Sequence, residues 1–278
     1  MSIKYKHFTN QELGFFKQYQ RESYRTLEQV NKNLKVGMTE IEAARMMRKA
    51  FHQQGVHSYF HVPVALFGER TGYPGDFGQL EALATDKKLE QGMAIILDAA
   101  PIYNGYIADT SFSTSFGENP QQSTLHKELQ YFRNEILSMV KEQKTFKEIE
   151  LAMNERIKLL GAENCHRKHI GEVMGHRVFM ATGFLWKYFR FRQLSVRHVF
   201  WLIWKSIASK KGWINDSPNW NHRYTSKHKP FEGLWAVEPH FSLHGIGVKF
   251  EEIMVITKDD AYWLDDELPH TLLWKKAE

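Results

Sequence analysis

The sequence predicts an α+β domain in which a curved, mostly antiparallel sheet is backed by helices. Three observations lead to this prediction: amphipathic helices that come in pairs, an Asn104-Gly105 turn between two strand-like runs, and a series of strand-like segments towards the C-terminal end. A length of 278 residues suits one large domain or two small ones. Because no internal repeat is visible, we predict a single domain over residues 1–278.

The predicted helices are recognised by their start signals and by their apolar spacing. The first begins at a capping box formed by Thr9 and Glu12 and ends near Gly37. The second begins at another capping box, Thr39 with Glu42, and runs to about residue 54. Apolar residues that recur at helical spacing predict a second pair over residues 125–139 and 146–160.

The predicted strands follow from short apolar runs between turn signals. The first covers residues 62–67, and a long polar loop rich in glycine follows over residues 68–92. A hairpin is centred on Asn104-Gly105, because Asn-Gly between two apolar runs is the strongest short hairpin signal. Later strands are predicted over residues 170–180, 234–242, 246–257 and 262–264.

The hairpin carries two carboxylates, Asp98 and Asp109. With a two-residue turn, Asp98 lies opposite Ser111 and Asp109 lies opposite Ala100, so both carboxylates face the same way as diagonal neighbours about 7–8 Å apart at the backbone. Asp98 also follows the apolar run 94–97, and a buried carboxylate needs a partner. Two solvated aspartates are the alternative, but such a pair can grip one metal ion, or two ions about 3.5–4 Å apart.

Three later strand-like segments each supply one more candidate metal ligand. They are His176 in EVMGHRVF, Glu238 in LWAVEPHF and Glu251 in GVKFEEIMVIT. Each has an ordinary structural explanation: a core or surface histidine, a charge at a strand end, and a glutamate of an edge strand. Taken with the two aspartates, they supply carboxylate and imidazole donors that suit Mn, Fe, Co or Zn in a site with open positions.

The order of these pieces resembles the methionine aminopeptidase, prolidase and aminopeptidase P family, the M24 metallopeptidases. The pieces are ILDAAPIYNGYIADTSFSTSFG, MGHRVF, AVEPHF and GVKFEEIMVIT, and the early stretch VGMTEIEAARMMRKAF resembles the start of that family's catalytic domain. The resemblance covers nearly the whole chain apart from residues 184–232 and is to the short, single-domain members. It implies the pita-bread fold, with two halves related by a pseudo-twofold, and a site for two metal ions.

The resemblance also implies a role for each matching residue. Asp98 would chelate one ion, Asp109 and Glu251 would bridge both ions, and His176 and Glu238 would complete the two shells. In the hydrolase that these ligands suggest, Glu238 would in addition act as general base and acid.

Glu251 is preferred to its neighbour Glu252 because it takes the family's place, six residues before the strand-ending Thr257. Some short members share a Glu-x-His piece, which makes His240 a second catalytic candidate.

Two histidines that contact substrate in peptidases of this family are missing from the expected places. The loop before the first aspartate reads Gly72-Tyr73-Pro74-Gly75 where Pro-His is usual, and Gly183 stands seven residues after the metal-binding histidine. His61, His240 or His244 would have to substitute, and we assign His61 and His244 to substrate binding. Ordinary surface histidines are the alternative for all three.

The remaining composition points to a cytoplasmic protein. A single cysteine, Cys165, excludes an intrachain disulfide and a cysteine-based metal site, which fits a reducing compartment. The N-terminal residues show no apolar core of a signal peptide, and no stretch of about 18 apolar residues is present to span a membrane.

Residues 184–232 are predicted as a basic, aromatic insertion between the strands of His176 and Glu238. The chain carries +5, whereas residues 184–230 hold ten lysines and arginines, one acid and five of the eight tryptophans, a net charge of +9. A packed excursion or a homodimer interface is the first interpretation, and a lid or a peripheral contact with anionic lipid are alternatives. Nucleic acid is not the expected partner, although such a composition also suits it. We expect Trp201 and Trp204 to bury against the body, a second subunit or a membrane.

These observations predict a hydrolase of the aminopeptidase or Xaa-Pro dipeptidase type. Two divalent ions, for example manganese, would activate a water that attacks a peptide or dipeptide. The missing histidines and the insertion keep two alternatives open: a catalytically altered pita-bread domain that binds a ligand or partner, and a metal enzyme that acts on a small non-peptide amide.

Overall fold

The structure is a computed structural model that describes residues 3–76, 81–181, 190–191 and 193–276. The α-helices of this part are α1 (Asn10–Lys32), α2 (Glu40–Gln53), α3 (Pro120–Lys141), α4 (Phe146–Leu159), α5 (Val196–Lys210) and α6 (Pro269–Lys276). Its strands are β1 (Ile3–Lys4), β2 (Val64–Phe67), β3 (Ala94–Ala99), β4 (Ile102–Tyr103), β5 (Tyr106–Ile107), β6 (Thr110–Ser115), β7 (Glu163–Asn164), β8 (Gly175–Val178), β9 (Met180–Ala181), β10 (Arg190–Phe191), β11 (Leu194–Ser195), β12 (Asn219–Trp220), β13 (Gly233–Val237), β14 (His240–Leu243), β15 (Ile246–Ile256) and β16 (Ala261–Trp263).

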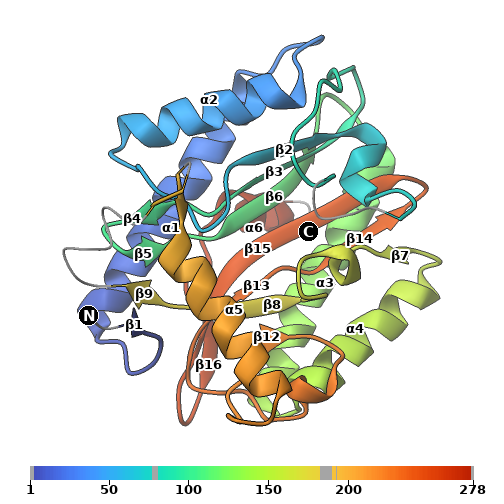
Figure 1. Cartoon of the computed structure of the whole chain (residues 1–278). Helices are drawn as coiled ribbons and strands as arrows, with labels where there is room; N and C mark the ends of the chain where they lie inside the picture. The colour runs from blue at the N-terminus through green and yellow to red at the C-terminus, as the bar shows by residue number, and fades with distance from the viewer. Residues whose placement is uncertain (1–2, 77–80, 182–189, 192, 277–278) are drawn as a thin grey trace.

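A curved antiparallel sheet forms the centre of the molecule (Figure 1). Its strands follow the order β12-β8-β13-β15-β6-β3-β2, and β14 and β16 also pair with β15. With 11 residues, β15 is long enough to pair with β13, β14, β16 and β6 in turn. The predicted α+β class with a curved, mostly antiparallel sheet is confirmed.

A pair of helices covers each half of the sheet. Helices α1 and α2 pack on β2 and β3 through residues such as Tyr24, Met47 and Phe51. Helices α3 and α4 pack on β13 and β15 through a second cluster that includes Phe132 and Trp235. In Figure 1 the two pairs lie at opposite ends of the sheet, which is the arrangement that the pita-bread fold implies.

The helices begin where the sequence places their caps. The capping boxes of Thr9 and Thr39 both form, and Thr145 forms a third at the start of α4. Helix α3 begins at Pro120, five residues before the predicted range, because the Asn119 side chain caps it and proline suits the first helical position.

The Asn104-Gly105 turn forms as predicted, but the hairpin is not one continuous ladder. Both turn residues have positive φ angles, and Asp98 lies opposite Ser111. The β3–β6 ladder ends at Ala99, however, and β4 and β5 belong to a separate four-stranded sheet with β1 and β9. The predicted pairing of Ala100 with Asp109 is therefore absent from the ladder.

The ladder ends there because the backbone groups of Ala100 and Ile102 form hydrogen bonds with residues 58–60 instead of with the partner strand. The Ala100 carbonyl accepts a hydrogen bond from Phe60 N–H, and Ile102 N–H donates to the Ser58 carbonyl. As a result, residues 58–63 run beside the carboxylates, and the strand predicted from residue 62 begins at Val64.

The strand predicted over residues 234–242 is divided into β13 and β14. The break falls at Glu238-Pro239, where proline has no N–H to donate to a ladder. The long loop predicted over residues 68–92 opens with a short 3-10 helix, η1 (Gly68–Gly72). Gly247 of β15 lies so close to η1 that a Cβ there would stand 1.9 Å from the Thr71 carbonyl oxygen, which leaves room only for glycine.

The predicted insertion is built around α5, and its residues 184–189 and 192 lie outside the described residues. Trp201 packs its ring 4.3 Å from that of Phe179, as expected for burial against the body. Trp204 is 49% exposed, and neighbouring apolar residues of the same face are exposed as well: Phe200, Ile203 and Ile207. Contact of this face with a second subunit or a membrane stays a prediction. No helix among the described residues is both long and apolar enough to cross a bilayer.

The single cysteine lies between β7 and a short 3-10 helix at His166–Lys168. Cys165 is fully buried, and its Sγ stands 3.1 Å from the Gly72 carbonyl oxygen.

Candidate metal centre

The five predicted metal ligands lie on five neighbouring strands or directly beside them. Asp98 is in β3, Asp109 precedes β6, Glu251 is in β15, Glu238 follows β13, and His176 is in β8. Because these strands stand side by side in the sheet, the five side chains form one row across it. The β13 ladder ends at Val237 and the β14 ladder begins at His240, so Glu238 lies at the break between them, beside β15.

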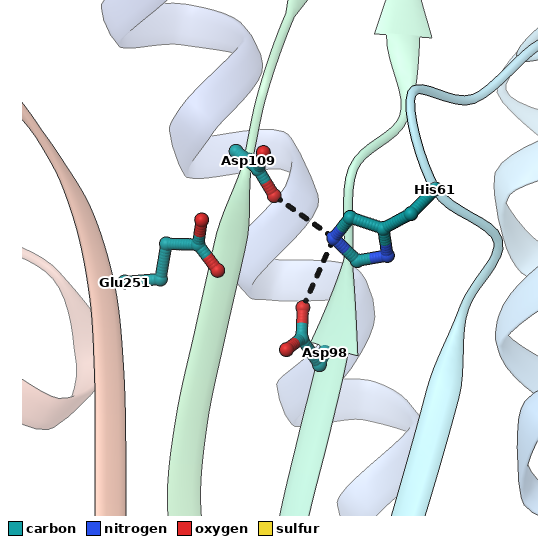
Figure 2. A group of neighbouring side chains, drawn as sticks. All are labelled: His61, Asp98, Asp109 and Glu251. Carbon is teal, nitrogen blue, oxygen red and sulfur yellow. Dashed lines mark hydrogen bonds and ion pairs between the residues drawn. The ribbon is translucent and has the colours of Figure 1, made fainter. Parts of the chain in front are cut away.

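The row forms two groups of possible ligands that share Glu251. Within each group, one ligand atom of every residue lies within 4.8 Å of the others. The first group is His61, Asp98, Asp109 and Glu251, and the second is His176, Glu238 and Glu251. Figure 2 shows the first group: the His61 ring reaches from its loop between the two aspartates, and Glu251 faces them from the opposite side.

Both histidines in these groups present Nε2 to carboxylates. His61 Nδ1 lies 3.1 Å from the Val62 carbonyl oxygen, and its Nε2 lies 3.1 Å from Asp109 Oδ1 and 3.4 Å from Asp98 Oδ1. His176 Nδ1 lies 3.4 Å from the carbonyl of the next residue, and its Nε2 lies 3.2 Å from Asp109 Oδ2. A carbonyl only accepts, so Nδ1 carries the hydrogen in both rings. The neutral ring then points the Nε2 lone pair at the carboxylates, which is the orientation of a metal-binding histidine.

The carboxylates in the row crowd one another. Burial and the nearby Asp109 carboxylate raise the pKa of Glu251 to about 8, although Lys249 opposes the rise. Burial alone would lower the pKa of His61, but the charges of Asp109 and Asp98 outweigh it and raise the pKa to about 10. Burial would raise the pKa of Asp109, and His61 and His176 instead hold it well below its usual value.

These residues fit a divalent metal ion. Two buried carboxylate oxygens, Asp98 Oδ1 and Asp109 Oδ2, accept no well-oriented hydrogen bond from the described part of the chain and face only the Nε2 atoms of His61 and His176. Buried polar atoms without a partner are rare, because losing water without a replacement is costly. One cation can satisfy several such oxygens together, and mixed oxygen and imidazole donors suit a first-row transition metal.

Lys249 is an unexpected member of the site. Its Nζ lies 2.6 Å from Asp98 Oδ2, 2.9 Å from Glu238 Oε2 and 3.2 Å from Glu251 Oε2. Burial would lower the pKa of this ammonium, but the three carboxylates raise it well above its usual value. Lys249 therefore brings a fixed positive charge into the row.

A chain of hydrogen bonds runs from Glu238 to a backbone carbonyl. His240 Nε2 lies 2.7 Å from the Thr71 carbonyl, His240 Nδ1 lies 3.0 Å from His169 Nε2, and His169 Nδ1 lies 2.9 Å from Glu238 Oε2. The carbonyl can only accept, so His240 donates through Nε2 and accepts through Nδ1. His169 then donates through both of its nitrogens, one to His240 and one to the Glu238 carboxylate.

The three histidines proposed to substitute for the missing pair lie in different places. His61 lies among the metal-ligand candidates rather than at the edge of the site. His240 is fully buried and reaches Glu238 only through His169. His244 is exposed on the turn between β14 and β15 and is not among the residues brought to the carboxylates. Gly183 lies outside the described residues.

Sequence reasoning missed Lys249 and His169. Lys249 carried a usable signal, because a residue two positions before Glu251 in a strand faces the same side. His169 follows a short 3-10 helix, where no regular spacing predicts the direction of a side chain.

The fold is similar to those of solved peptidases of low sequence identity. They include an X-Pro aminopeptidase from Thermotoga maritima MSB8 (TM-score 0.68, 20% identity, covering 92% of this chain and 61% of that one). A dipeptidase from Pyrococcus horikoshii OT3 gives a TM-score of 0.67 at 16% identity over 94% of this chain and 61% of that one. A prolidase from Pyrococcus furiosus gives 0.62 at 18% identity over 94% and 64%. This chain therefore spans about three fifths of the length of these proteins.

No curated protein sequence matches the chain. The family model of metallopeptidase family M24, in contrast, matches residues 15–261, which include every ligand candidate in the row. With the match extending over most of the sequence and the pita-bread fold beneath it, this chain belongs to metallopeptidase family M24.

Proposed function

We propose that the chain is a metal-dependent hydrolase of the aminopeptidase or Xaa-Pro dipeptidase type. The observation that carries the proposal is the convergence of carboxylate and imidazole side chains from five neighbouring strands on one buried site, in a member of a metallopeptidase family. The solved structures of similar fold are described as X-Pro aminopeptidase, dipeptidase and prolidase, which supports a peptide or dipeptide as substrate.

The ligand candidates support up to two divalent ions, since two groups share Glu251. Manganese, cobalt, iron and zinc all suit such donors. A bound ion would lower the pKa of a coordinated water and polarise the carbonyl group of the scissile amide.

Glu238 is the proposed general base and acid. Its carboxylate would accept the proton of the attacking water and return it to the leaving nitrogen. Burial would raise the pKa of Glu238, but Lys249 and His169 hold it well below its usual value. Glu238 is therefore ionised and oriented before the water arrives, and the relay through His169 to His240 fixes the direction of its carboxylate. In this proposal His240, first considered a catalytic residue, positions His169.

The test is a hydrolysis screen of the purified chain. Loaded with Mn²⁺, the protein is expected to release amino acids from dipeptides, including Xaa-Pro dipeptides, and to stop when a chelator removes the metal. Asp109→Asn should abolish this activity, whereas Asp259→Asn, at an exposed aspartate outside the row, should leave it unchanged. A folded, metal-loaded chain that cleaves none of the dipeptides would contradict the proposed peptidase activity.

A second candidate function is favoured by the neighbourhood of Lys249 and Tyr73. An ammonium already neutralises part of the row, and the Gly72-Tyr73-Pro74-Gly75 loop offers no histidine to a substrate. These features suit an enzyme for a small non-peptide amide, or a catalytically altered domain that binds a ligand. Release of product from simple amides, with none from dipeptides, would select the first of these; metal binding without any hydrolysis would select the second.

A further inference from the structure

We propose that the Lys249 ammonium takes the place of one of the two metal ions, so that the chain holds one divalent ion firmly, on the side of His61. The inference rests on the metal dependence of the proposed function, but not on its substrate. It assigns His61 as a metal ligand.

The position of Lys249 is fixed by the strand that carries it. Lys249 and Glu251 are two residues apart in β15, so their side chains leave the same face of the sheet. The Lys249 side chain is only 4% exposed and has contacts with carboxylates from three different strands or strand ends. This ammonium is therefore a built part of the site.

Lys249 contacts both glutamates of one ligand group but only one oxygen of Asp98 in the other. In the group of His176, Glu238 and Glu251, Lys249 Nζ lies 2.9 Å and 3.2 Å from one oxygen of each glutamate. A metal ion bonds such oxygens at about 2.0–2.2 Å, so an ion shared by the same two oxygens would stand close to the ammonium. Two positive centres in a buried site repel strongly, so an ion can enter this group only if Lys249 moves away.

The other ligand group keeps the atoms that an ion needs. Lys249 contacts only Oδ2 of Asp98, so in the described chain Asp98 Oδ1 and both oxygens of Asp109 face the Nε2 atoms of His61 and His176 alone. His61 adds an imidazole whose Nδ1 is occupied by the Val62 carbonyl, leaving Nε2 directed at both aspartates. This group therefore offers an ion a nitrogen donor and an Asp98 oxygen that Lys249 does not contact.

The experiment is a titration of the metal-free protein with Mn²⁺. Bound manganese is measured by equilibrium dialysis and elemental analysis, and electron paramagnetic resonance shows whether two ions lie close enough to couple. We expect the native chain to bind one Mn²⁺ per molecule, with a second binding at least about tenfold more weakly. Lys249→Met should bind two ions of comparable affinity and show the coupled spectrum.

Matched variants separate these effects from general damage. Lys205→Met removes another buried lysine, which pairs with Asp216 at 3.3 Å outside the row, and should still bind one ion. His61→Ala should weaken the first ion by about 10–100-fold, the scale on which groups that support a metal act. His244→Ala, at an exposed histidine, should not change it.

Two ions of equal affinity in the native chain would overturn the inference, and so would a single ion in a folded Lys249→Met variant. If Lys249→Met does not fold, the native titration and His61→Ala decide the question together. Failure of the proposed function is distinguishable: one firmly bound ion without any hydrolysis contradicts the function alone, and hydrolysis with two equal ions contradicts the inference alone.

Discussion

Two neighbouring glutamates on opposite faces of β15 have opposite environments. Glu252 is fully buried and faces α3 and α6, where it pairs with Arg133 and accepts a 2.7 Å hydrogen bond from His270. Burial would raise its pKa, but Arg133 and His270 lower it. Glu251 is equally buried, yet it faces other carboxylates, and its pKa is raised to about 8.

The difference separates a structural carboxylate from a functional one. The partners of Glu252 come from the chain itself, so its charge stabilises the packing of helices on the sheet. Among the described residues, Glu251 has only one cation within 3.2 Å, the Lys249 ammonium, and shares it with Asp98 and Glu238, so it retains binding capacity for a further cation. Burial alone does not distinguish these two residues, whereas the sign of the charges on their neighbours does.

The largest effect is expected on stability, from a substitution that breaks the ion pair between Glu252 and Arg133. Within the described chain, Glu252→Gln leaves the buried Arg133 guanidinium with only the largely exposed Asp266 carboxylate as its counter-ion and should lower the free energy of unfolding by about 3 kcal/mol. Urea denaturation measures the change. The double variant Arg133→Met/Glu252→Met, which removes both charges, should recover much of the loss, and a Glu252→Gln chain as stable as the native one would show that this face is not structural.

A smaller effect, of a different kind, is expected on the other face. Glu251→Gln should weaken Mn²⁺ binding at least about a hundredfold, or about 2.7 kcal/mol, because both ligand groups lose their shared carboxylate. The metal-free variant should be at least as stable as the native chain, because a crowded carboxylate has gone. Dialysis and denaturation are measured on the same sample, and native metal affinity in the variant would refute the role of Glu251.

The third effect is a dependence of metal affinity on pH, which is the smallest when counted per proton and per pH unit. Metal binding requires an ionised Glu251, whose pKa is about 8, and a neutral His61, whose pKa is about 10. Both pKa values are raised, so each group holds a proton at neutral pH in the metal-free chain. Both protons must be released when a metal ion binds.

The dissociation constant for Mn²⁺ should therefore fall between pH 6 and pH 8, by about tenfold per pH unit for each proton released, or about 1.4 kcal/mol. Above pH 8 only the proton of His61 is left to release, so the slope should decrease. In His61→Ala one proton fewer is released and the slope should be shallower throughout. A flat profile in a folded native chain would be inconsistent with the crowding of Glu251.

The sequence predicts the parts of this site that depend on local geometry. The Asn104-Gly105 turn requires positive φ angles, so it brings Asp98 and Asp109 to the same region even though the ladder between them is interrupted. The resemblance favoured Glu251 over Glu252 as the metal ligand. The structure gives the physical reason, because the Glu252 carboxylate is already paired with Arg133 and His270.

The parts that depend on distant segments could not be predicted in the same way. Alternation puts Lys249 on the face of Glu251, but only the pairing of β15 with β6 and β14 shows that this face meets Asp98 and Glu238. His61 lies beside the aspartates because residues 58–60 take the hydrogen bonds at Ala100 and Ile102, a long-range exchange without a local signal.

The buried thiol has a practical consequence for the study of this molecule. Desolvation raises the pKa of Cys165 to about 12, so at neutral pH almost none of it is in the thiolate form that reacts with maleimides or iodoacetamide. The native chain can thus serve as an unreactive background for site-specific labelling. A cysteine introduced at an exposed position such as Leu159 would react selectively, and the distance from its spin label to a bound paramagnetic Mn²⁺ could be measured without first replacing Cys165.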